Sequence, residues 1–315
     1  MTYDSLAGSI LNFTCNFGFL INKYCNNLDR YNILYIMHDN YSHKEDGIDY
    51  VDENIPGPED QTNEYISLIE KFNSQLAHSC DCNFKCKENY CSCLKISGGS
   101  NYTSHIVSQY VEIFKVKEQE TGLHCYPIIE CSQHCKCSET CGNRVVQNGP
   151  IDTLFVTTCE DVSKGLGLFT REFIPKGTFV CEYAGEVITK SEALRRQKFN
   201  QTHNKMNYIF CLNEHVNGIV IQTFVDPSLF GNIGRYINHS CESNCVIIPV
   251  RVDSPIPKLA LFSCVDILAN GEITFDYGSS YLTSSKEIIS ESLNERKICL
   301  CRSSNCRGFM PYDVY

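Results

Sequence analysis

Nine cysteine thiols lie in two short segments and have the close spacing of metal ligands. Residues 80–93 read CDCNFKCKENYCSC, and residues 131–141 read CSQHCKCSETC. A structural zinc ion binds four ligands in a tetrahedron, so three zinc ions need twelve ligand positions. Nine thiolates supply these positions when three of them each bridge two ions. The spacing therefore predicts a three-zinc cluster whose ligands are Cys80, Cys82, Cys86, Cys91, Cys93, Cys131, Cys135, Cys137 and Cys141.

Disulfide bonds are the alternative for these thiols. The chain has 21 cysteines in 315 residues, a density typical of short secreted proteins that carry a signal peptide. The sequence begins MTYDSLAGSILNFTC, which lacks the basic and apolar regions of such a signal. Pairing would also leave one of the nine thiols over, so metal binding is favoured. Cys125 lies near the second segment and could be a ligand, but the nine thiols supply all twelve ligand positions without it.

A third thiol group lies near the C-terminal end, where the chain reads CLCRSSNC. Cys299, Cys301 and Cys306 are one ligand short of a closed zinc site. Cys241 can supply the fourth thiolate from the polar segment INHSCESN. A zinc ion held in this way would clamp the C-terminal tail over that segment.

The elements that position these groups are mostly short strands. From about residue 144 the chain alternates β-rich runs such as GTFVCEYAGEVI and KLALFSCVD with turns that contain glycine or asparagine. One helix is indicated at TKSEALRRQKF, where Thr189 and Glu192 have the spacing of a capping box. Residues 1–50 favour a helix or two, and KISGGSNYTSH is expected to be a flexible loop. The sequence therefore predicts a mixed α+β, β-rich fold.

Composition and charge narrow the classes of function. The chain is 43% hydrophobic and 20% charged, as expected of a folded soluble protein. It has no uninterrupted apolar run of about 18 residues, so no membrane span is expected. A net charge of −10 argues against direct sequence-specific binding to nucleic acid and is compatible with a basic peptide as partner.

Four further motifs combine residue types that serve binding and catalysis. KGLG, from Lys164, has two glycines that let a ligand approach the backbone, and EYAGE places Tyr183 at the end of a strand. GRYINHSC gathers an arginine, an asparagine and a histidine. EITFDYG puts Phe275 and Tyr277 on one face of a strand, because side chains alternate along it. Any one of these tyrosines alone is more often a packing residue than a catalyst.

Together, in this order and flanked by the thiol segments, the motifs resemble those of the SET-domain histone-lysine N-methyltransferases with pre-SET and post-SET zinc modules. The runs CGNRVVQNG, EFIPKGTFVCEYAGEVI, TFVDPSLFGNIGRYINHSCESN and IPKLALF are most similar to the SETMAR-type members, near the branch that modifies lysine 9 of histone H3. The resemblance covers roughly residues 50–310. It implies the SET fold, in which several small curved sheets and a knot-like C-terminal substructure bring INHSC and FDYG together.

The resemblance also implies a division of the chain and a cofactor. The segments would be an N-terminal extension (1–50), a three-zinc pre-SET module (51–143), a SET catalytic domain (144–282) and a zinc-bound post-SET module (283–315). The implied cofactor is S-adenosylmethionine. Its binding residues would be Lys164, Gly165, Leu166, Gly167, Tyr208, Arg235, Asn238 and His239.

The implied reaction is an in-line displacement in which a neutral lysine amine attacks the sulfonium methyl group. Because a free lysine has a pKa of about 10.4, a narrow apolar channel must favour the uncharged amine by desolvation. Tyr183, Tyr208, Phe275 and Tyr277 would line this channel, with the Tyr277 hydroxyl orienting the amine as the catalytic group. A phenylalanine at position 275 leaves space for added methyl groups, which predicts di- or trimethylation.

Three residues depart from the pattern of the family. Leu166 stands where tryptophan is usual, Ser243 replaces a proline, and Phe275 stands where SETMAR-type members tend to have tyrosine. The last departure leaves open the product state and the target, lysine 9 or lysine 36 of histone H3.

Three functions are compatible with these motifs: a histone methyltransferase, a methyltransferase of a non-histone protein, and a chromatin scaffold without turnover. The retained Arg235, Asn238, His239 and Tyr277 argue for an active enzyme. The expected partner is a histone tail peptide or a nucleosome, bound by a monomeric protein on chromatin in the nucleus.

Overall fold

The computed structural model describes residues 47–108, 111–116, 127–216, 218–278 and 297–311. All of them belong to one compact unit that extends from residue 37 to residue 315. The helices expected in residues 1–50 fall almost wholly outside the described residues, as do Cys15, Cys25 and Cys125. Among the helices that are described, none is both long and apolar enough to cross a membrane.

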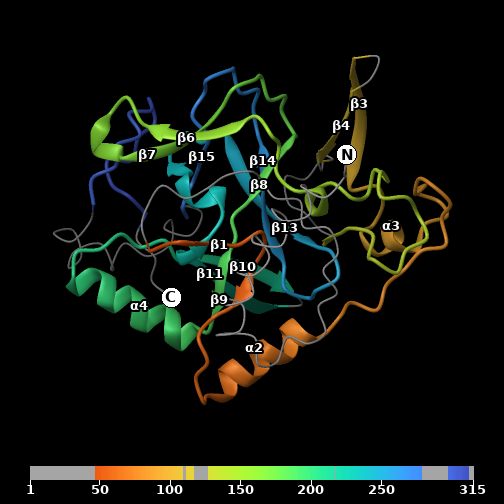
Figure 1. Cartoon of the computed structure of the whole chain (residues 1–315), viewed down its shortest axis with the longest axis horizontal. Helices are drawn as coiled ribbons and strands as arrows, with labels where there is room; N and C mark the ends of the chain where they lie inside the picture. Colours follow the sequence, from red (N-terminus) through yellow and green to blue (C-terminus); the bar gives the residue numbers. More distant parts are fainter. Residues whose placement is uncertain (1–46, 109–110, 117–126, 217, 279–296, 312–315) are drawn as a thin grey trace, which may run out of the picture. The chain divides into compact units, whose positions relative to one another are not determined.

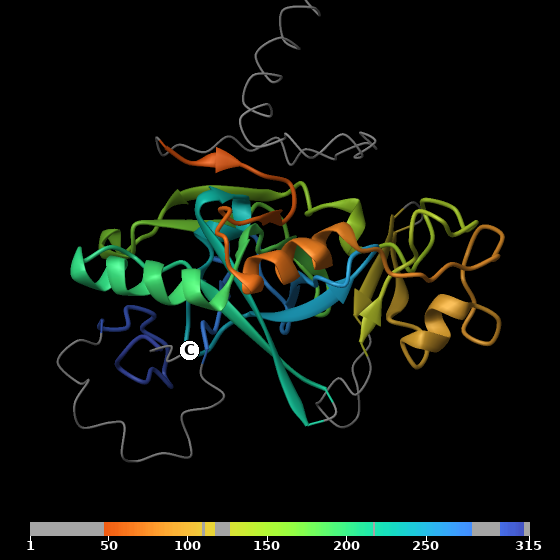
Figure 2. The same ribbon diagram turned by 90° about the horizontal axis from the view of Figure 1, so that it is seen from below.

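Strands dominate the fold, as the short β-rich runs predict (Figure 1). The first sheet has the strand order β1-β11-β9-β2, and β10 also pairs with β11. These strands are β1 (Asp49–Tyr50), β2 (Ile55–Pro56), β9 (Gly185–Ile188), β10 (Phe210–Val216) and β11 (Ile219–Gly231). Figure 2 shows β10 and β11 as a long antiparallel hairpin. The other edge of β11 pairs antiparallel with β9, and its register shifts between Asp226 and Gly231.

The second sheet brings two of the sequence motifs side by side. Its strand order is β12-β15-β13-β14-β8, and β5 also pairs with β13. The strands are β5 (Ile128–Ile129), β8 (Phe179–Glu182), β12 (Asn238–His239), β13 (Cys245–Arg251), β14 (Lys258–Ser263) and β15 (Thr274–Phe275). In the parallel pair β12 and β15, Asn238 lies opposite Thr274 and His239 opposite Phe275. INHSC and EITFDYG are therefore neighbours, although more than thirty positions separate them in the sequence.

Two hairpins complete the strands. β6 (Leu154–Thr158) and β7 (Leu166–Thr170) pair antiparallel, and KGLG spans the end of the turn between them and the first two residues of β7. β3 (Tyr102–Ser108) and β4 (Val111–Val116) form the second hairpin. The prediction of a flexible loop at KISGGSNYTSH is wrong at both ends of that run, because Lys95 and Ile96 end α3 and the last four residues begin β3. Helix α3 ends before the glycines, the last of which is Gly99. The tyrosine and threonine that follow are residue types that favour a strand.

The helices are few and short. They are α2 (Asn63–Asn73), α3 (Ser92–Ile96) and α4 (Lys190–Thr202), with short 3₁₀ turns η1 (Val146–Asn148), η2 (Val162–Lys164) and η3 (Ile233–Tyr236). Thr189 caps α4 as predicted, because its hydroxyl accepts a hydrogen bond from Glu192 N. The reciprocal half of the capping box is replaced, since the Glu192 carboxylate binds Arg195 and Arg196 instead.

One apolar core supports the elements that carry the motifs. Its members that are at most 1% exposed include Leu168, Val180, Val225, Ile237, Leu261 and Ile273. They come from β7, β8, β11, β14 and the segments beside β12 and β15. Because both sheets and the β6–β7 hairpin share this core, the motifs are held at fixed positions relative to one another. The predicted β-rich fold with few helices is confirmed for the described residues.

Candidate functional site

The first two thiol segments come together in space. Three groups of four cysteines each have their sulfur atoms within 4.8 Å of one another. The groups are Cys80, Cys86, Cys131 and Cys137; Cys80, Cys93, Cys131 and Cys135; and Cys80, Cys82, Cys86 and Cys91. Cys141 lies against them, because its sulfur accepts a 3.4 Å hydrogen bond from Cys86 N. Sulfur atoms at this spacing fit zinc, and no disulfide joins any cysteines of the described residues.

Three thiols form the centre of this arrangement. Cys80, Cys86 and Cys131 each belong to more than one group. The sulfur of Cys86 lies 3.6 Å from that of Cys80 and 3.5 Å from that of Cys131. Thiols in these positions are able to contact two metal ions each, which is what a bridging ligand requires.

The residues that follow the second thiol segment hold it in place. The buried Arg144 guanidinium donates to the carbonyl oxygens of Cys131 and Ser132, at 3.1 Å and 2.8 Å. Asn143 Nδ2 donates to the Cys131 sulfur at 3.4 Å. The buried Glu130 carboxylate accepts hydrogen bonds from the backbone N–H groups of Val145 and Val146, at 2.8 Å and 2.7 Å. The run CGNRVVQ therefore connects the thiol cluster to the sheets.

The third thiol group also forms, and it lies against the polar segment. The sulfur atoms of Cys241, Cys299, Cys301 and Cys306 all lie within 4.8 Å of one another. His239 Nδ1 accepts a 3.2 Å hydrogen bond from Tyr277 N, so the imidazole proton is assigned to Nε2. Nε2 lies 3.4 Å from the Cys241 sulfur, and burial lowers the pKa of His239. A neutral imidazole thus joins this thiol group to the EITFDYG motif.

The turn between β6 and β7 has a backbone that only glycine adopts readily. Gly165 has a φ of +77° and open space where a side chain would point. A Cβ atom at Gly167 would lie 2.7 Å from the Cys159 sulfur and 3.1 Å from Asn238 Nδ2. The turn therefore leaves room on one side and packs closely against Asn238 on the other, as a cofactor cradle requires.

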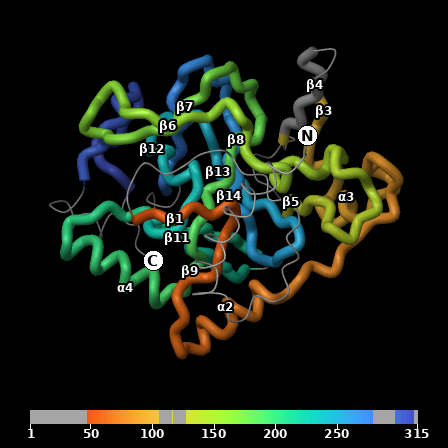
Figure 3. The backbone as a smooth tube through the Cα atoms, in the orientation of Figure 1, coloured from red at the N-terminus to blue at the C-terminus, as the bar shows by residue number. Residues whose placement is uncertain are grey.

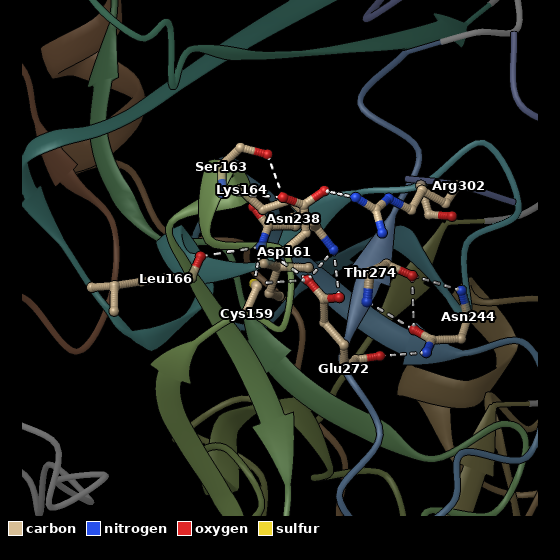
Figure 4. A network of polar contacts seen from close by, with 12 residues as sticks. Cys159, Asp161, Ser163, Lys164, Leu166, Asn238, Asn244, Glu272, Thr274 and Arg302 are labelled. Carbon is tan, nitrogen blue, oxygen red and sulfur yellow. Dashed lines mark hydrogen bonds and ion pairs between the residues drawn. The ribbon is translucent and has the colours of Figure 1, made fainter. Parts of the chain in front are cut away.

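A network of polar contacts connects this turn to β12 and β15, as Figure 4 shows. Asn238 Nδ2 donates to Leu166 O at 3.1 Å and to Glu272 Oε1 at 2.9 Å. Lys164 Nζ donates to the same Glu272 oxygen at 2.7 Å. Sequence reasoning missed Glu272, although it stands inside EITFDYG, because an acidic residue at a strand end is usually exposed to solvent.

Arg235 and Tyr208 stack on each other. The Arg235 guanidinium carbon lies 4.7 Å from the centre of the Tyr208 ring, and Arg235 Nε donates to Pro227 O at 3.1 Å. The stacking and the hydrogen bond fix both side chains next to η3. Both residues were expected at the cofactor site, and they come together from two segments: Tyr208 precedes β10, and Arg235 lies in η3 just before INHSC.

Four aromatic rings gather around β15. Phe275 has its ring centre 5.8 Å from that of Tyr183, 5.8 Å from that of Phe210 and 4.7 Å from that of Tyr277. The sequence predicted Tyr183, Phe275 and Tyr277 but missed Phe210. Its position two residues after Tyr208 in a β-rich run was the available signal, because such residues share a face.

The phenol hydroxyls of this cluster are held by backbone carbonyls. Tyr183 Oη donates to Tyr208 O at 2.6 Å, and Tyr277 Oη donates to Ile237 O at 2.7 Å. Burial raises the pKa of Tyr183 and of Tyr277, so both phenols stay protonated. A protonated phenol orients and polarises a ligand but is a poor proton acceptor.

The departures from the family pattern leave the local contacts intact. Leu166 packs against the apolar core, and its carbonyl still accepts the hydrogen bond from Asn238. The Ser243 carbonyl accepts a 3.4 Å hydrogen bond from the Cys264 sulfur. Asn244 Nδ2 donates to Glu272 O at 2.7 Å, which ties the polar segment to the strand that leads to β15.

Comparisons with known proteins show which families this chain matches. Residues 165–278 match the SET domain family, and residues 26–144 match the Pre-SET motif family. The histone-lysine N-methyltransferase SETMAR of Mus musculus is 44% identical over 232 residues, which cover 72% of this chain and 71% of that protein. SETMAR of Homo sapiens has the same identity over the same length, but the match covers 32% of that longer protein. The probable histone-lysine N-methyltransferase set-23 of Caenorhabditis elegans is 38% identical, over 84% of this chain and 96% of its own length.

Solved structures show the same fold. The methyltransferase domain of human SETMAR aligns with a TM-score of 0.64 and 37% identity, covering 84% of this chain and 90% of that domain. KRYPTONITE, crystallised with mCHG DNA and SAH, aligns with a TM-score of 0.59 and 25% identity. That alignment covers 86% of this chain and 49% of KRYPTONITE.

Proposed function

This chain belongs to the SET-domain histone-lysine N-methyltransferases, and we propose that it transfers methyl groups from S-adenosylmethionine to a lysine of the histone H3 tail. Lysine 9 is favoured and lysine 36 is the second candidate. The observation that carries the proposal is the pairing of β12 with β15, which places Asn238 opposite Thr274 and His239 opposite Phe275. Residues suited to hold a cofactor and residues suited to enclose a lysine thereby meet at one point.

The cofactor would be held by the β6–β7 turn and by the residues around β12. KRYPTONITE contains SAH, the product form of this cofactor, in a related fold. Here the backbone of residues 164–167, together with Tyr208, Arg235, Asn238 and His239, would form its binding surface. When bound, S-adenosylmethionine supplies an electrophilic methyl group on a sulfonium.

The aromatic cluster would enclose the substrate lysine. Tyr183, Tyr208, Phe275 and Tyr277 would form its walls, and Phe210 would extend them. Such walls favour the neutral amine by desolvation, because burial penalises the charged ammonium form. The Tyr277 hydroxyl would orient the amine, and alignment of the reactants would supply most of the rate. The Phe275 ring lacks the hydroxyl that would occupy space beside the amine, which favours di- or trimethyl products.

The protein would bind four zinc ions, three in the first cluster and one in the C-terminal group. Cys80, Cys86 and Cys131 would bridge pairs of ions in the first cluster, because they lie at its centre. The remaining six ligands would be terminal, in the pairs Cys82 with Cys91, Cys93 with Cys135, and Cys137 with Cys141. Cys241, Cys299, Cys301 and Cys306 would bind the fourth ion. The segments 51–143, 144–282 and 283–315 would then be the pre-SET, SET and post-SET modules, after an extension of residues 1–50.

The proposed partner is a basic histone tail, alone or in a nucleosome. The protein would bind it as a monomer, on chromatin in the nucleus. The net charge of −10 favours a cationic peptide. KRYPTONITE is bound to DNA in its crystal, but this chain aligns with only 49% of it and has the wrong net charge for a DNA surface. No direct sequence-specific contact with nucleic acid is therefore proposed.

The test is a methyl-transfer assay with zinc, labelled S-adenosylmethionine and histone H3, followed by mass spectrometry of the product. The matched control is Tyr277→Phe, which removes one hydroxyl and keeps the ring. Transfer by the parent chain and its loss in the control would support the proposal and name the lysine. Cofactor binding without transfer to H3 or nucleosomes would point to a non-histone substrate, and absence of cofactor binding would favour a scaffold without turnover.

A further inference from the structure

Glu272 is a charged residue of the candidate site that no step of the proposed reaction uses. Its side chain is only 22% exposed. Its carbonyl oxygen accepts a 2.7 Å hydrogen bond from Asn244 Nδ2, and its backbone forms an antiparallel bridge with Phe169. Contacts on both sides thus fix the backbone at Glu272, and the carboxylate has a defined position before any cofactor binds.

The Glu272 carboxylate determines which way the Asn238 amide faces. Asn238 Nδ2 has three acceptors around it: Glu272 Oε1 at 2.9 Å, Leu166 O at 3.1 Å and the Cys159 sulfur at 3.3 Å. The reverse orientation would set the amide oxygen against a carboxylate and a carbonyl, which repel it. Asn238 Oδ1 therefore points away from these groups, and it accepts no hydrogen bond from any residue that the structure describes. It is an acceptor left for a ligand.

The same carboxylate neutralises Lys164. Lys164 Nζ lies 2.7 Å from Glu272 Oε1 and its side chain is 13% exposed. Without Glu272, the Lys164 ammonium in the KGLG turn would lose its ion-pair partner, and the nearby carboxylate left to it would be Asp161, whose pKa Lys164 also lowers. S-adenosylmethionine is itself cationic at its sulfonium and its amino group, so such a charge would repel it.

We propose that Glu272 is the positioning residue of the cofactor site. It holds the Asn238 amide with Oδ1 directed at an N–H donor of the cofactor, and it cancels the charge of Lys164 in the adjoining turn. This inference rests on the proposed function, because it assumes that the cofactor is S-adenosylmethionine. It assigns to the acidic residue of EITFDYG a role that acts through Asn238.

The experiment is a binding cycle measured by calorimetry with SAH, so that no turnover is needed. Four chains are compared in a Lys164→Met background, which removes the ammonium that would otherwise be stranded. They are the background alone, the background with Glu272→Leu, the background with Asn238→Ala, and the background with both. Loss of Glu272 is expected to weaken SAH binding at least about tenfold when Asn238 is present, the usual scale for a hydrogen bond to a charged group. When Asn238 is alanine, loss of Glu272 is expected to weaken SAH binding by less than about threefold.

An equal loss in both backgrounds, or no loss in either, would overturn the inference. If the unmodified chain fails to bind SAH, the proposed function fails instead, so the two failures are distinguishable. A matched control is Glu214→Leu with Arg251→Met, which removes another partly buried bidentate pair and should leave SAH affinity unchanged. If the leucine variant does not fold, Glu272→Ala in the same background removes the same acceptor, with thermal unfolding of the SAH-free protein as the check.

Discussion

Arg302 and Asp161 form a 2.7 Å ion pair that joins the C-terminal thiol segment to the turn carrying KGLG. The Asp161 carboxylate also accepts a 3.1 Å hydrogen bond from Ser163 N and so caps η2. On the other side of the segment, Arg307 forms a 2.8 Å pair with Asp276, next to Tyr277. Figure 3 traces this segment, in blue, beside the β6–β7 hairpin. The segment is thus attached both to the turn that leads into KGLG and to Asp276 beside the aromatic cluster.

Arg302→Gln should therefore weaken cofactor binding modestly without changing turnover at saturation. Arg302 is 78% exposed, and exposed ion pairs contribute about 0.2–1 kcal/mol, which corresponds to roughly 1.4- to 5-fold in the SAH dissociation constant. The difference between variant and parent should shrink between 25 and 300 mM salt, because salt screens surface pairs. The matched control is Arg195→Gln, which breaks an exposed pair on α4 and should leave SAH affinity as it is. A loss that is independent of salt would contradict this interpretation.

The number of bound zinc ions, measured in suitable variants, should distinguish the two thiol clusters. The parent chain is expected to hold about four zinc ions, and Cys306→Ser about three, because the C-terminal site loses one of its four ligands. Since Cys241 in that site follows His239 closely, this variant should also lose methyl transfer while the first cluster keeps its metal. Plasma emission spectrometry measures the metal, and Cys264→Ser is the control, since Cys264 belongs to neither cluster. Equal zinc in Cys306→Ser and parent would remove Cys306 from the ligands.

Much of this site could be predicted because its signals are local. Thiol spacing indicated the clusters, the Thr189 cap indicated α4, and alternation placed Phe275 with Tyr277. What the sequence could not give was pairing between distant segments. β3 was missed for a different, local reason, because the glycines that precede it indicated a loop. Glu272 was missed because its partners Lys164 and Asn238 come from two other elements. Such contacts are decided by how the sheets pack, which no local pattern encodes.

The rate of turnover should increase as pH rises from neutral to mildly alkaline values and should not decrease within that range. The fraction of neutral lysine amine grows with pH, since a free lysine has a pKa of about 10.4. Burial, followed by the effect of Tyr208, raises the pKa of Tyr277, so its hydroxyl stays protonated as pH increases. kcat/KM, measured from pH 7 to 9.5 on chain shown to remain folded, should rise throughout this range. A descending limb within it would show that Tyr277 ionises at its ordinary value or below.

Arg196 should be the residue on α4 whose loss destabilises the fold most. Its guanidinium lies 2.6 Å from Glu186 and 2.8 Å from Asp226, carboxylates that are 6% and 1% exposed. Arg196→Met would leave both without their cation, and breaking a buried pair costs about 3–5 kcal/mol of unfolding free energy. Urea unfolding measures the change, with Arg195→Met as an exposed neighbour expected to cost under about 1 kcal/mol.

This loss should depend on pH in a defined direction. Burial raises the pKa of Glu186, so the folded state binds more protons than the unfolded state above the ordinary glutamate value. The contribution of Glu186 to stability therefore falls as pH rises through that window. Removing Arg196 raises the pKa of Glu186 further, because Arg196 opposes the effect of burial. The Arg196→Met variant should therefore lose less unfolding free energy at pH 5 than at pH 8. An equal loss at pH 5 and pH 8 would show that Arg196 does not control the protonation of Glu186 in the folded state.

Phe275→Tyr should lower the number of methyl groups transferred. The Phe275 ring packs 5.8 Å from Tyr183 and 4.7 Å from Tyr277, so an added hydroxyl would enter the space among these rings rather than solvent. That hydroxyl would hold a water or occupy the room that a methylated amine needs in order to rotate and react again. Time-resolved mass spectra should show the parent proceeding to di- or trimethyl lysine and the variant accumulating monomethyl lysine, with the first transfer slowed less than about tenfold. Phe210→Tyr, which changes a ring in the same cluster, tests whether the position of the hydroxyl matters. If the parent itself stops at monomethyl lysine after long incubation, Phe275 does not open the space inferred for it.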